Sequence, residues 1–339
     1  MRLAFATTPL EKISFPSFIA FHPAAFRIHC SSIFIRLRFS LPCPPPFMQV
    51  SARPATLSAP YSPHLVEIPA SHRIQTHMNV VAIANQKGGV GKTTTAISLS
   101  AALAELGQRV LLLDLDPQAN ATSGLGVEPD SEGSMYYPLI GEAKIQEKVI
   151  PTRIENLSLV PSGMDLAGVE IELARSDDHL TRLRKLLTNL KRGKKYDYCI
   201  LDTPPSLGVL MTTSLAAADE VIIPLQCEWF GLEGLAKIVH VIEQIRESGA
   251  APKLKLEGIL MTMFDGRTNL SRQVVEEVSN YFPDQLYQSV IPRTIRIGEA
   301  PSHGKTIFEH DSSGIGAQAY RSAAQEFLIR HSNVGGPIA

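Results

Sequence analysis

Residues 79–94 read NVVAIANQKGGVGKTT, in which a short apolar run rich in β-branched residues leads into a glycine-rich loop. Such a run, bounded by turn residues, is typical of a buried strand. Beyond the loop, apolar residues recur at spacings of three and four as far as residue 106, and Gly107 follows as a helix stop. The stretch therefore predicts a strand over 80–84, a tight loop, and a helix over 92–106.

The loop has the composition of a phosphate-binding site. Its three glycines let main-chain N–H groups point inward around phosphate oxygens, and the helix N-terminus adds its positive end. Lys92 can supply charge to the β- and γ-phosphates of a nucleotide, and Thr93 can offer a hydroxyl to Mg²⁺. Gln86 replaces the first glycine of the usual G-x-x-x-x-G-K-[ST] pattern. A strand is nevertheless predicted before the loop and a helix after it, as a phosphate-binding loop requires and a simple glycine-rich turn does not. The predicted nucleotide contacts are Lys87, Gly88, Gly89, Val90, Gly91, Lys92, Thr93 and Thr94.

The chain from residue 79 alternates short apolar runs with amphipathic helical patterns, with no internal repeat or linker. This alternation predicts an α/β fold with a single doubly wound, mostly parallel sheet flanked by helices, in one domain over 78–330. The expected strands cover 80–84, 110–114, 157–160, 198–202, 221–225, 258–264 and 286–291. The expected helices cover 92–106, 177–191, 232–248, 270–282 and 315–330.

The first 77 residues differ from the remainder. They hold 11 of the 24 prolines, so we expect an unstructured extension there and a flexible tail over 331–339. Three interpretations of the extension are open: an over-extended reading frame preceding a start at Met78, a disordered tail, or a targeting peptide. The extension carries seven Lys/Arg and two Asp/Glu, which leaves residues 78–339 with a net charge of −6. A body of that charge can hold nucleic acid only through a local basic patch.

The four cysteines include no C-x-x-C pair and no cluster at zinc spacing, so neither a zinc nor an iron–sulfur site is expected. Cys199 and Cys227 lie inside apolar runs, which predicts buried, reduced thiols. Reduced thiols fit a cytoplasmic protein.

Aspartates stand at the ends of two predicted strands. Asp114 and Asp116 lie at the end of the second strand, and Asp202 ends the fourth. The carboxyl ends of parallel strands meet at one edge of a sheet, beside the loop, where a metal ion would bind. A single aspartate there is more commonly a helix cap, but three at such places favour a metal site.

In these motifs the chain resembles the ParA/MinD superfamily of deviant Walker A ATPases. The hallmark K-G-G-x-G-K-[ST] is matched at residues 87–93. The resemblance continues through DLDPQ at 114–118, LDTPP at 201–205, IPR at 291–293 and EAPSHG at 299–304, and so spans 78 to about 330. It implies an ATPase that uses ATP and Mg²⁺, is weak alone, and is stimulated by a partner.

The resemblance also implies roles for single residues in an ATP-bound sandwich homodimer. Lys87 would reach across the dimer interface to the nucleotide of the other subunit. Asp116 would orient the attacking water, and Asp202 would hold the Mg²⁺ shell together with Thr93. Pro292 would contact the nucleotide.

Among the branches of this superfamily, the segments ANQ at 84–86 and QCEWFGLEG at 226–234 resemble the chromosomal ParA, or Soj, branch. The last residues cannot form the membrane-targeting helix of MinD-like proteins, so no membrane partner is expected. In the Soj branch, arginines of the C-terminal half bind the nucleoid, and Arg267 and Arg296 match them, with Arg293 as a neighbour. Alternatively, these are solvated surface arginines, or Arg293 lines the nucleotide pocket.

Two functions remain in view. The first is a cytoplasmic, nucleoid-associated ATPase that dimerises with ATP, binds double-stranded DNA non-specifically, and partitions chromosomes or plasmids with a ParB-like centromere-binding protein. The second is a ParA-like ATPase that positions a cargo other than DNA, such as a polar protein cluster.

Overall fold

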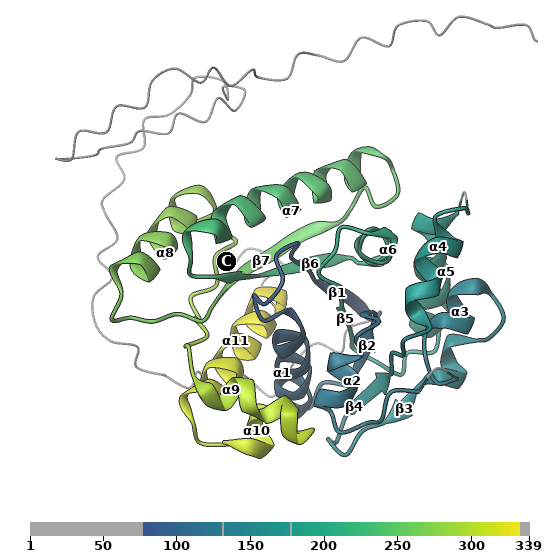
Figure 1. Cartoon of the computed structure of the whole chain (residues 1–339), viewed down its shortest axis with the longest axis horizontal. Helices are drawn as coiled ribbons and strands as arrows, with labels where there is room; N and C mark the ends of the chain where they lie inside the picture. The colour runs from purple at the N-terminus through teal and green to yellow at the C-terminus, as the bar shows by residue number, and fades with distance from the viewer. Residues whose placement is uncertain (1–76, 131, 177, 333–339) are drawn as a thin grey trace, which may run out of the picture. The chain divides into compact units, whose positions relative to one another are not determined.

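The computed structural model describes residues 77–332 except 131 and 177, and their strands form a single sheet (Figure 1). The strand order is β3-β4-β2-β5-β1-β6-β7, and only the β3–β4 pair is antiparallel. The predicted doubly wound, mostly parallel α/β fold is thus confirmed. The strands are β1 (Asn79–Ile83), β2 (Val110–Asp114), β3 (Ile150–Pro151), β4 (Leu157–Val160), β5 (Tyr198–Asp202), β6 (Glu220–Gln226) and β7 (Lys255–Thr262).

The five expected helices are present, with ends within three residues of the predicted ones, as α1, α5, α7, α8 and α11. Several short helices that the sequence analysis did not predict fill the connections. The helices are α1 (Lys92–Glu105), α2 (Asn120–Gly124), α3 (Tyr136–Ile140), α4 (Leu166–Leu173), α5 (His179–Arg192), α6 (Val209–Ala217), α7 (Trp229–Glu247), α8 (Asn269–Tyr281), α9 (Ile295–Glu299), α10 (Ile307–His310) and α11 (Ile315–Ser332), with 3₁₀ turns η1 (Ile145–Lys148) and η2 (Ala300–His303). The extension expected before Met78 and the tail expected over 331–339 lie outside the described residues, apart from His77 and the end of α11.

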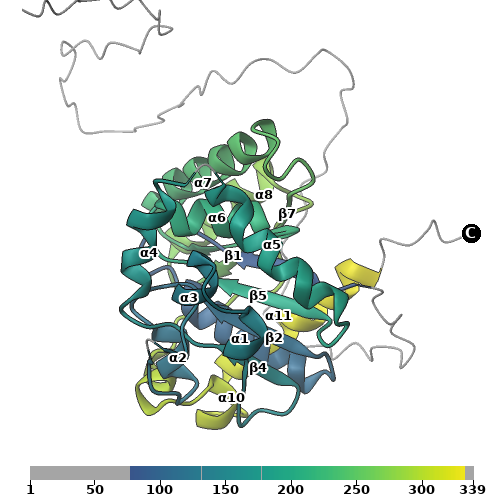
Figure 2. The same ribbon diagram turned by 90° about the vertical axis from the view of Figure 1, so that its right-hand side faces the viewer.

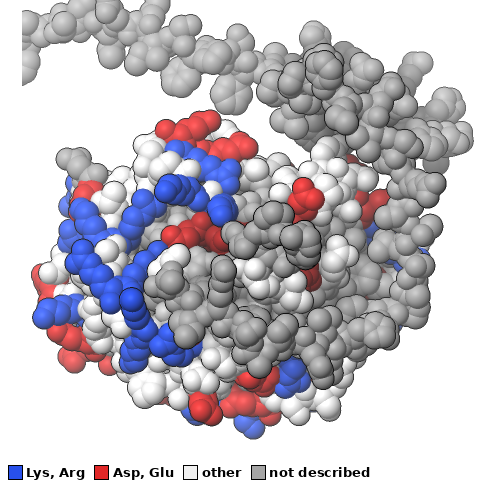
Figure 3. Space-filling model, turned by 180° about the vertical axis from the view of Figure 1, so that it is seen from behind, with Lys and Arg blue, Asp and Glu red and all other residues white. Residues whose placement is uncertain are grey.

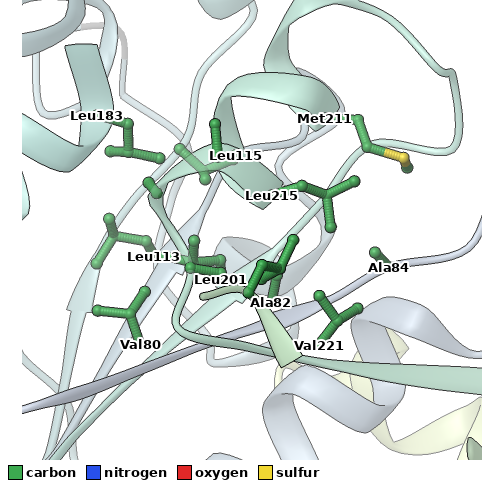
Figure 4. Packing of buried hydrophobic residues seen from close by; sticks show 14 of the residues in the cluster. Val80, Ala82, Ala84, Leu113, Leu115, Leu183, Leu201, Met211, Leu215 and Val221 are labelled. Atoms are coloured by element: carbon green, nitrogen blue, oxygen red, sulfur yellow. The ribbon is translucent and has the colours of Figure 1, made fainter. Parts of the chain in front are cut away.

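The core has two layers because successive side chains of a strand point to opposite faces of the sheet. In β2, Leu111 and Leu113 pack with α4 to α8, whereas Val110 and Leu112 pack with α1 and α11 (Figure 2). Figure 4 shows the first layer, where strand residues meet Leu183 of α5 and side chains of α6. The expected buried thiols, Cys199 and Cys227, are free and buried. No helix in the described part of the chain is long and apolar enough to cross a bilayer.

The strand predicted over 286–291 is wrong. This segment forms no continuous ladder with β7. An isolated parallel bridge joins Leu286 to Ile259, the Ile291 N–H donates to the carbonyl of Met261 at 2.8 Å, and a second bridge joins Pro292 to Phe264 just beyond both segments. Between the two bridges, the main-chain N–H groups of 288 and 289 donate to the carboxylate of Glu326 on α11, at 2.8 and 2.9 Å. The ladder is interrupted because a side chain distant in sequence captures these two donors.

The parallel register sets the position of the candidate site. Ile83 at the end of β1 lies opposite Asp202 of β5, and Asp202 lies opposite Asp114 of β2. The loop that follows β1 and the aspartates that end β2 and β5 therefore share the carboxyl edge of the sheet. Open α/β sheets bind their ligands at this edge.

Candidate active site

The glycine-rich loop between β1 and α1 adopts a conformation that its glycines permit. Gly89 and Gly91 have φ angles of +74° and +87°, in the left-handed region that side-chain-bearing residues rarely adopt. Gly88 and Gly89 are exposed, and a Cβ added to either would meet no atom within 4 Å. The loop therefore presents bare main chain on its outer side.

Two side chains fix the loop to the neighbouring strands. Asn85 accepts the main-chain N–H of Lys87 at 3.0 Å and donates to the carbonyl of Pro224 in β6 at 2.8 Å. Thr262 at the end of β7 donates to the carbonyl of Val90 at 2.8 Å. The local sequence does not reveal the bonds to Pro224 and from Thr262, because each joins residues well over a hundred positions apart.

Lys92, the first residue of α1, folds back over the loop. Its side chain is buried, and its amino group donates to the carbonyl of Lys87 at 3.2 Å. Burial lowers the pKa of Lys92, while attraction to Asp202 and Asp116 opposes the change. Thr93 and Thr94 follow in the first helical turn and are half-buried. The amino group is therefore held over the loop, at the carboxyl edge of the sheet.

Asp202 is fully buried, and neither of its carboxylate oxygens has a hydrogen-bond partner in the described structure. Burial raises its pKa well above the usual 3.8, and the charges of Asp114 and Asp116 raise it further, whereas the Thr93 hydroxyl and Lys92 lower it. A buried carboxylate without such partners is costly in free energy. A proton on the carboxylate, or a cation bound next to it, removes this cost.

Asp114 has a different environment from that of Asp202. It accepts hydrogen bonds from the N–H and hydroxyl of Thr122, at 2.8 and 2.7 Å, and from the N–H of Asp116 at 3.2 Å. Its pKa is raised to about 6, chiefly by burial, although the bonds to Thr122 lower it. Its oxygens are occupied by these contacts, so Asp114 anchors the loop after β2 to α2.

Asp116 is buried at the start of the loop that follows β2. Its Oδ1 accepts the N–H of Gln118 at 3.0 Å, and its carbonyl accepts the Ser162 hydroxyl at 2.6 Å. Its Oδ2 has no hydrogen-bond partner among the described residues. One carboxylate oxygen is thus held in place while the other remains available.

The donor set fits Mg²⁺ held in part by phosphate. No three His, Cys, Asp or Glu side chains within the described ranges form a ready metal cage. Mg²⁺ in nucleotide sites takes only one or two protein oxygens and completes its shell with phosphate and water. The unpartnered carboxylate of Asp202 and the Thr93 hydroxyl beside it are oxygen donors of this kind.

Lys87 points away from its own loop. Its amino group lies 3.1 Å from Oε2 of Glu228 and 3.4 Å from Oε1 of Gln226, at the end of β6. Gln226 also donates to Oε1 of Glu228 at 2.6 Å. The side chain of Lys87 remains 30% exposed, so this contact is open to solvent on one side. Glu228 is a partner that the local sequence around Lys87 does not reveal.

The two candidate DNA-contact arginines are exposed and carry ion pairs. Arg267 is 89% exposed and makes two hydrogen bonds to Asp265, at 2.9 and 2.7 Å. This pairing lowers the pKa of Asp265 to about 2. Arg296 is 61% exposed and lies 3.3 Å from Glu299. Both guanidinium groups can exchange a carboxylate partner for a phosphate.

These arginines follow two segments that lie side by side. The bridge between Phe264 and Pro292 sets the loop after β7 next to the segment before α9. Arg267 comes three residues after the first bridge residue, and Arg296 comes four after the second. Arg293 is exposed, and half-buried Pro292 lies in the same bridge at this edge. The structure thus brings the two arginine-bearing segments together at the nucleotide edge of the sheet.

Known proteins resemble the chain in both sequence and structure. The family that matches residues 78–256 is described as an AAA domain. The chromosome partitioning protein ParA of Myxococcus xanthus is 48% identical over 252 residues, 74% of this chain and 88% of that protein. The sporulation initiation inhibitor protein Soj of Bacillus subtilis is 48% identical over 248 residues, 73% of this chain and 97% of that protein.

Among solved structures, cobyrinic acid a,c-diamide synthase of Mycobacterium smegmatis, with bound ADP and magnesium, has a TM-score of 0.66 and 38% identity. The match covers 76% of this chain and 97% of the other.

Proposed function

The chain belongs to the ParA/MinD superfamily, in its Soj branch, and from this membership we propose that it partitions chromosomes or plasmids as an ATP-switched dimer on DNA. It is an ATPase, with Mg·ATP as its substrate. In this proposal ATP favours a face-to-face homodimer, and the dimer binds double-stranded DNA without sequence preference. The protein is then cytoplasmic and associated with the nucleoid.

The unpartnered carboxylate of Asp202 is the observation that most strongly supports the Mg·ATP site on which this proposal rests. This group is buried at the carboxyl edge of the sheet, where the Lys92 amino group attracts it, next to a loop that presents bare main chain. An anion held by the loop, together with a cation bound to Asp202, would balance the charges of the site. When bound, Mg²⁺ polarises the phosphates and neutralises developing charge.

The residues of this chain divide the remaining work. Lys92 holds the β- and γ-phosphates, Thr93 and Asp202 hold the metal shell, and Pro292 contacts the nucleotide. Asp116, with one oxygen fixed by the loop, accepts a hydrogen bond from the attacking water and orients it.

Lys87 acts on the partner's nucleotide in the proposed dimer. In the single chain, its amino group forms an ion pair with Glu228, which follows β6 and is not part of the phosphate loop. The exposed main chain at Gly88 and Gly89 lets a second loop approach closely. Dimerisation would exchange the Glu228 contact for one with phosphate across the interface.

DNA binding is proposed to depend on Arg267 and Arg296. Each chain offers one pair of arginines at the nucleotide edge, so a dimer that joins these edges brings four to one face. A ParB-like centromere-binding protein would then stimulate hydrolysis and release the DNA. If the cargo is not DNA, the same ATP-driven dimer should form but should have no affinity for DNA.

Titration of duplex DNA with the ATP-bound protein over a range of salt concentrations tests the proposal. By neutralising four phosphates, these four arginines should contribute about −3.6 to the slope of log affinity against log salt. The single changes Arg267→Glu and Arg296→Glu should each reduce this contribution to about −1.8 or remove it, with ATP-driven dimerisation intact. Arg175→Glu, which changes an exposed arginine in a different segment, between α4 and α5, is the matched control and should leave the slope unchanged. A charge-reversed dimer with full DNA affinity would overturn the assignment.

A further inference from the structure

A second concentration of positive charge lies at the end of α5, away from the proposed site. Between His179 and Tyr196 the chain carries seven Lys/Arg and no Asp/Glu. In Figure 3, which brings the α5 side of Figure 1 to the left, Lys and Arg side chains gather in a band on that side. This charge stands out on a body whose net charge is −6.

Contacts join the end of α5 to basic residues of two other segments. Arg109, just before β2, donates to the carbonyl of Lys194 at 3.1 Å. The Lys191 amino group lies 2.6 Å from the carboxylate of Asp219, and the carbonyl of Asp219 accepts the N–H of Lys255 at 3.0 Å. We call this connected group the α5 basic surface. It consists of Arg109, Lys191, Arg192, Lys194, Lys195, Lys253 and Lys255.

Most of these charges have no ion-pair partner. Arg109 pairs with Asp197 at 2.6 Å, and Lys191 pairs with Asp219. The other five are exposed and form no ion pair with any residue that the structure describes: Arg192, Lys194, Lys195, Lys253 and Lys255. Two of them have weaker partners, since Lys255 attracts Glu220 opposite it on β6 and Lys195 lies over the Tyr196 ring. Like charges brought together without partners are unfavourable, and an anionic ligand relieves that cost.

The surface lacks the features of a protein interface or a membrane anchor. The apolar side chains of α5, Leu183, Leu187 and Leu190, are buried in the core and cannot enter a bilayer. None of the exposed large apolar side chains of the described chain lies in the segments that form the surface. Protein interfaces centre on apolar and aromatic residues, whereas phosphate backbones are bound by Lys and Arg.

We propose that the α5 basic surface is a second contact for the phosphate backbone of double-stranded DNA. The proposal takes its ligand class from the DNA binding proposed above, but it uses different residues and a different edge of the sheet. These residues lie before or at the start of β2, β5 and β7, whereas the nucleotide residues lie at or after the opposite ends of the strands. A five-residue strand separates the two edges by about 15 Å. The contact is therefore independent of ATP and dimerisation, and it keeps a nucleotide-free chain near DNA.

The test uses the full chain without nucleotide, titrated against a random-sequence duplex over a range of salt concentrations. Replacing two contacts, in Arg192→Ala with Lys195→Ala, should make the log–log slope shallower by about 1.8 and weaken binding about 60-fold at about 0.1 M salt. The matched control, Lys144→Ala with Arg175→Ala, also removes one exposed lysine and one exposed arginine and should change neither quantity. The difference between variants is the readout, because residues 1–77 carry seven Lys/Arg of their own.

The outcomes separate this inference from the proposed function. If both double variants bind like wild type without nucleotide, while Arg267→Glu abolishes binding in ATP, the α5 contact is wrong and the proposed switch stands. If ATP adds no DNA affinity but the α5 variant loses its residual binding, the surface is supported and the switch fails. Tighter binding of the surface to anionic lipid vesicles or polyglutamate than to DNA would overturn DNA as its ligand.

Discussion

Asp202→Asn should make the ligand-free protein more stable while removing the benefit that it gains from Mg·ATP. The carboxylate is fully buried and lacks hydrogen-bond partners, so its ionised form weakens the folded state. A neutral side chain of the same shape removes that charge. A buried neutral group without hydrogen bonds costs about 1–3 kcal/mol and a charged one costs more, so the substitution recovers only the difference between the two. A difference of about 2 kcal/mol raises the Tm of a domain of this size by about 4–8 °C.

The pH dependence follows from the direction of the pKa shift. Asp202 has a higher pKa in the folded chain than the usual 3.8, so the folded state binds its proton more tightly. The cost of ionisation is absent below about pH 3.8, grows as pH rises, and is complete above the folded pKa. The stability advantage of Asp202→Asn should therefore increase with pH over that window.

Differential scanning calorimetry with and without Mg·ATP measures both effects. At a ligand concentration of about 100 times Kd, wild type should gain about 2.7 kcal/mol, whereas Asp202→Asn should gain much less. Asp114→Asn is the matched control, since Asp114 accepts three hydrogen bonds, and this change should destabilise the protein in both conditions. A ligand-free Asp202→Asn protein less stable than wild type would refute the reasoning, because the carboxylate would then be satisfied in the native state.

Other changes at the site separate nucleotide binding, dimerisation and hydrolysis. Lys87→Ala should leave ATP binding to the single chain intact but weaken ATP-driven dimerisation, so a normal dimer in sedimentation would remove the cross-interface role. Glu228→Gln should weaken the contact that holds Lys87 and strengthen the dimer, and an unchanged dimer constant would count against that contact as a restraint. Gly88→Val should bind ATP, because the single chain has open space there, and fail to dimerise; an ATP-bound dimer of this variant would contradict the close approach. Asp116→Ala should retain the ATP-bound dimer and stay on DNA without turnover, and normal phosphate release would exclude Asp116 from water orientation.

The local signals of the sequence predicted most of the fold. Apolar runs at β2, β4 and β5 gave strand bounds that agree with the structure, because each run is short and flanked by breaks in the pattern. The glycines at 89 and 91 and the helix that opens at Lys92 are likewise encoded within a few residues. Periodicity and turn chemistry are local properties, so a single chain reveals them.

The features that the sequence did not reveal depend on distant partners. The segment 286–291 has the composition of a strand, yet Glu326 on α11 captures its amide donors. Asp114 and Asp202 look alike in sequence, and only their surroundings make one an anchor and the other an unpartnered charge. The contact of Lys87 with Glu228 likewise joins residues that only the fold brings together.

The most direct test of the switch measures DNA affinity and oligomeric state in the same samples, without nucleotide, with Mg·ADP and with Mg·ATP. We predict that only ATP converts the chain to a dimer, and that the dimer binds duplex DNA of any sequence at least about tenfold more tightly, since the log-salt slope steepens as contacts are added. Equal DNA affinity in all three states, or a dimer that forms with ATP and gains no DNA affinity, would contradict the account.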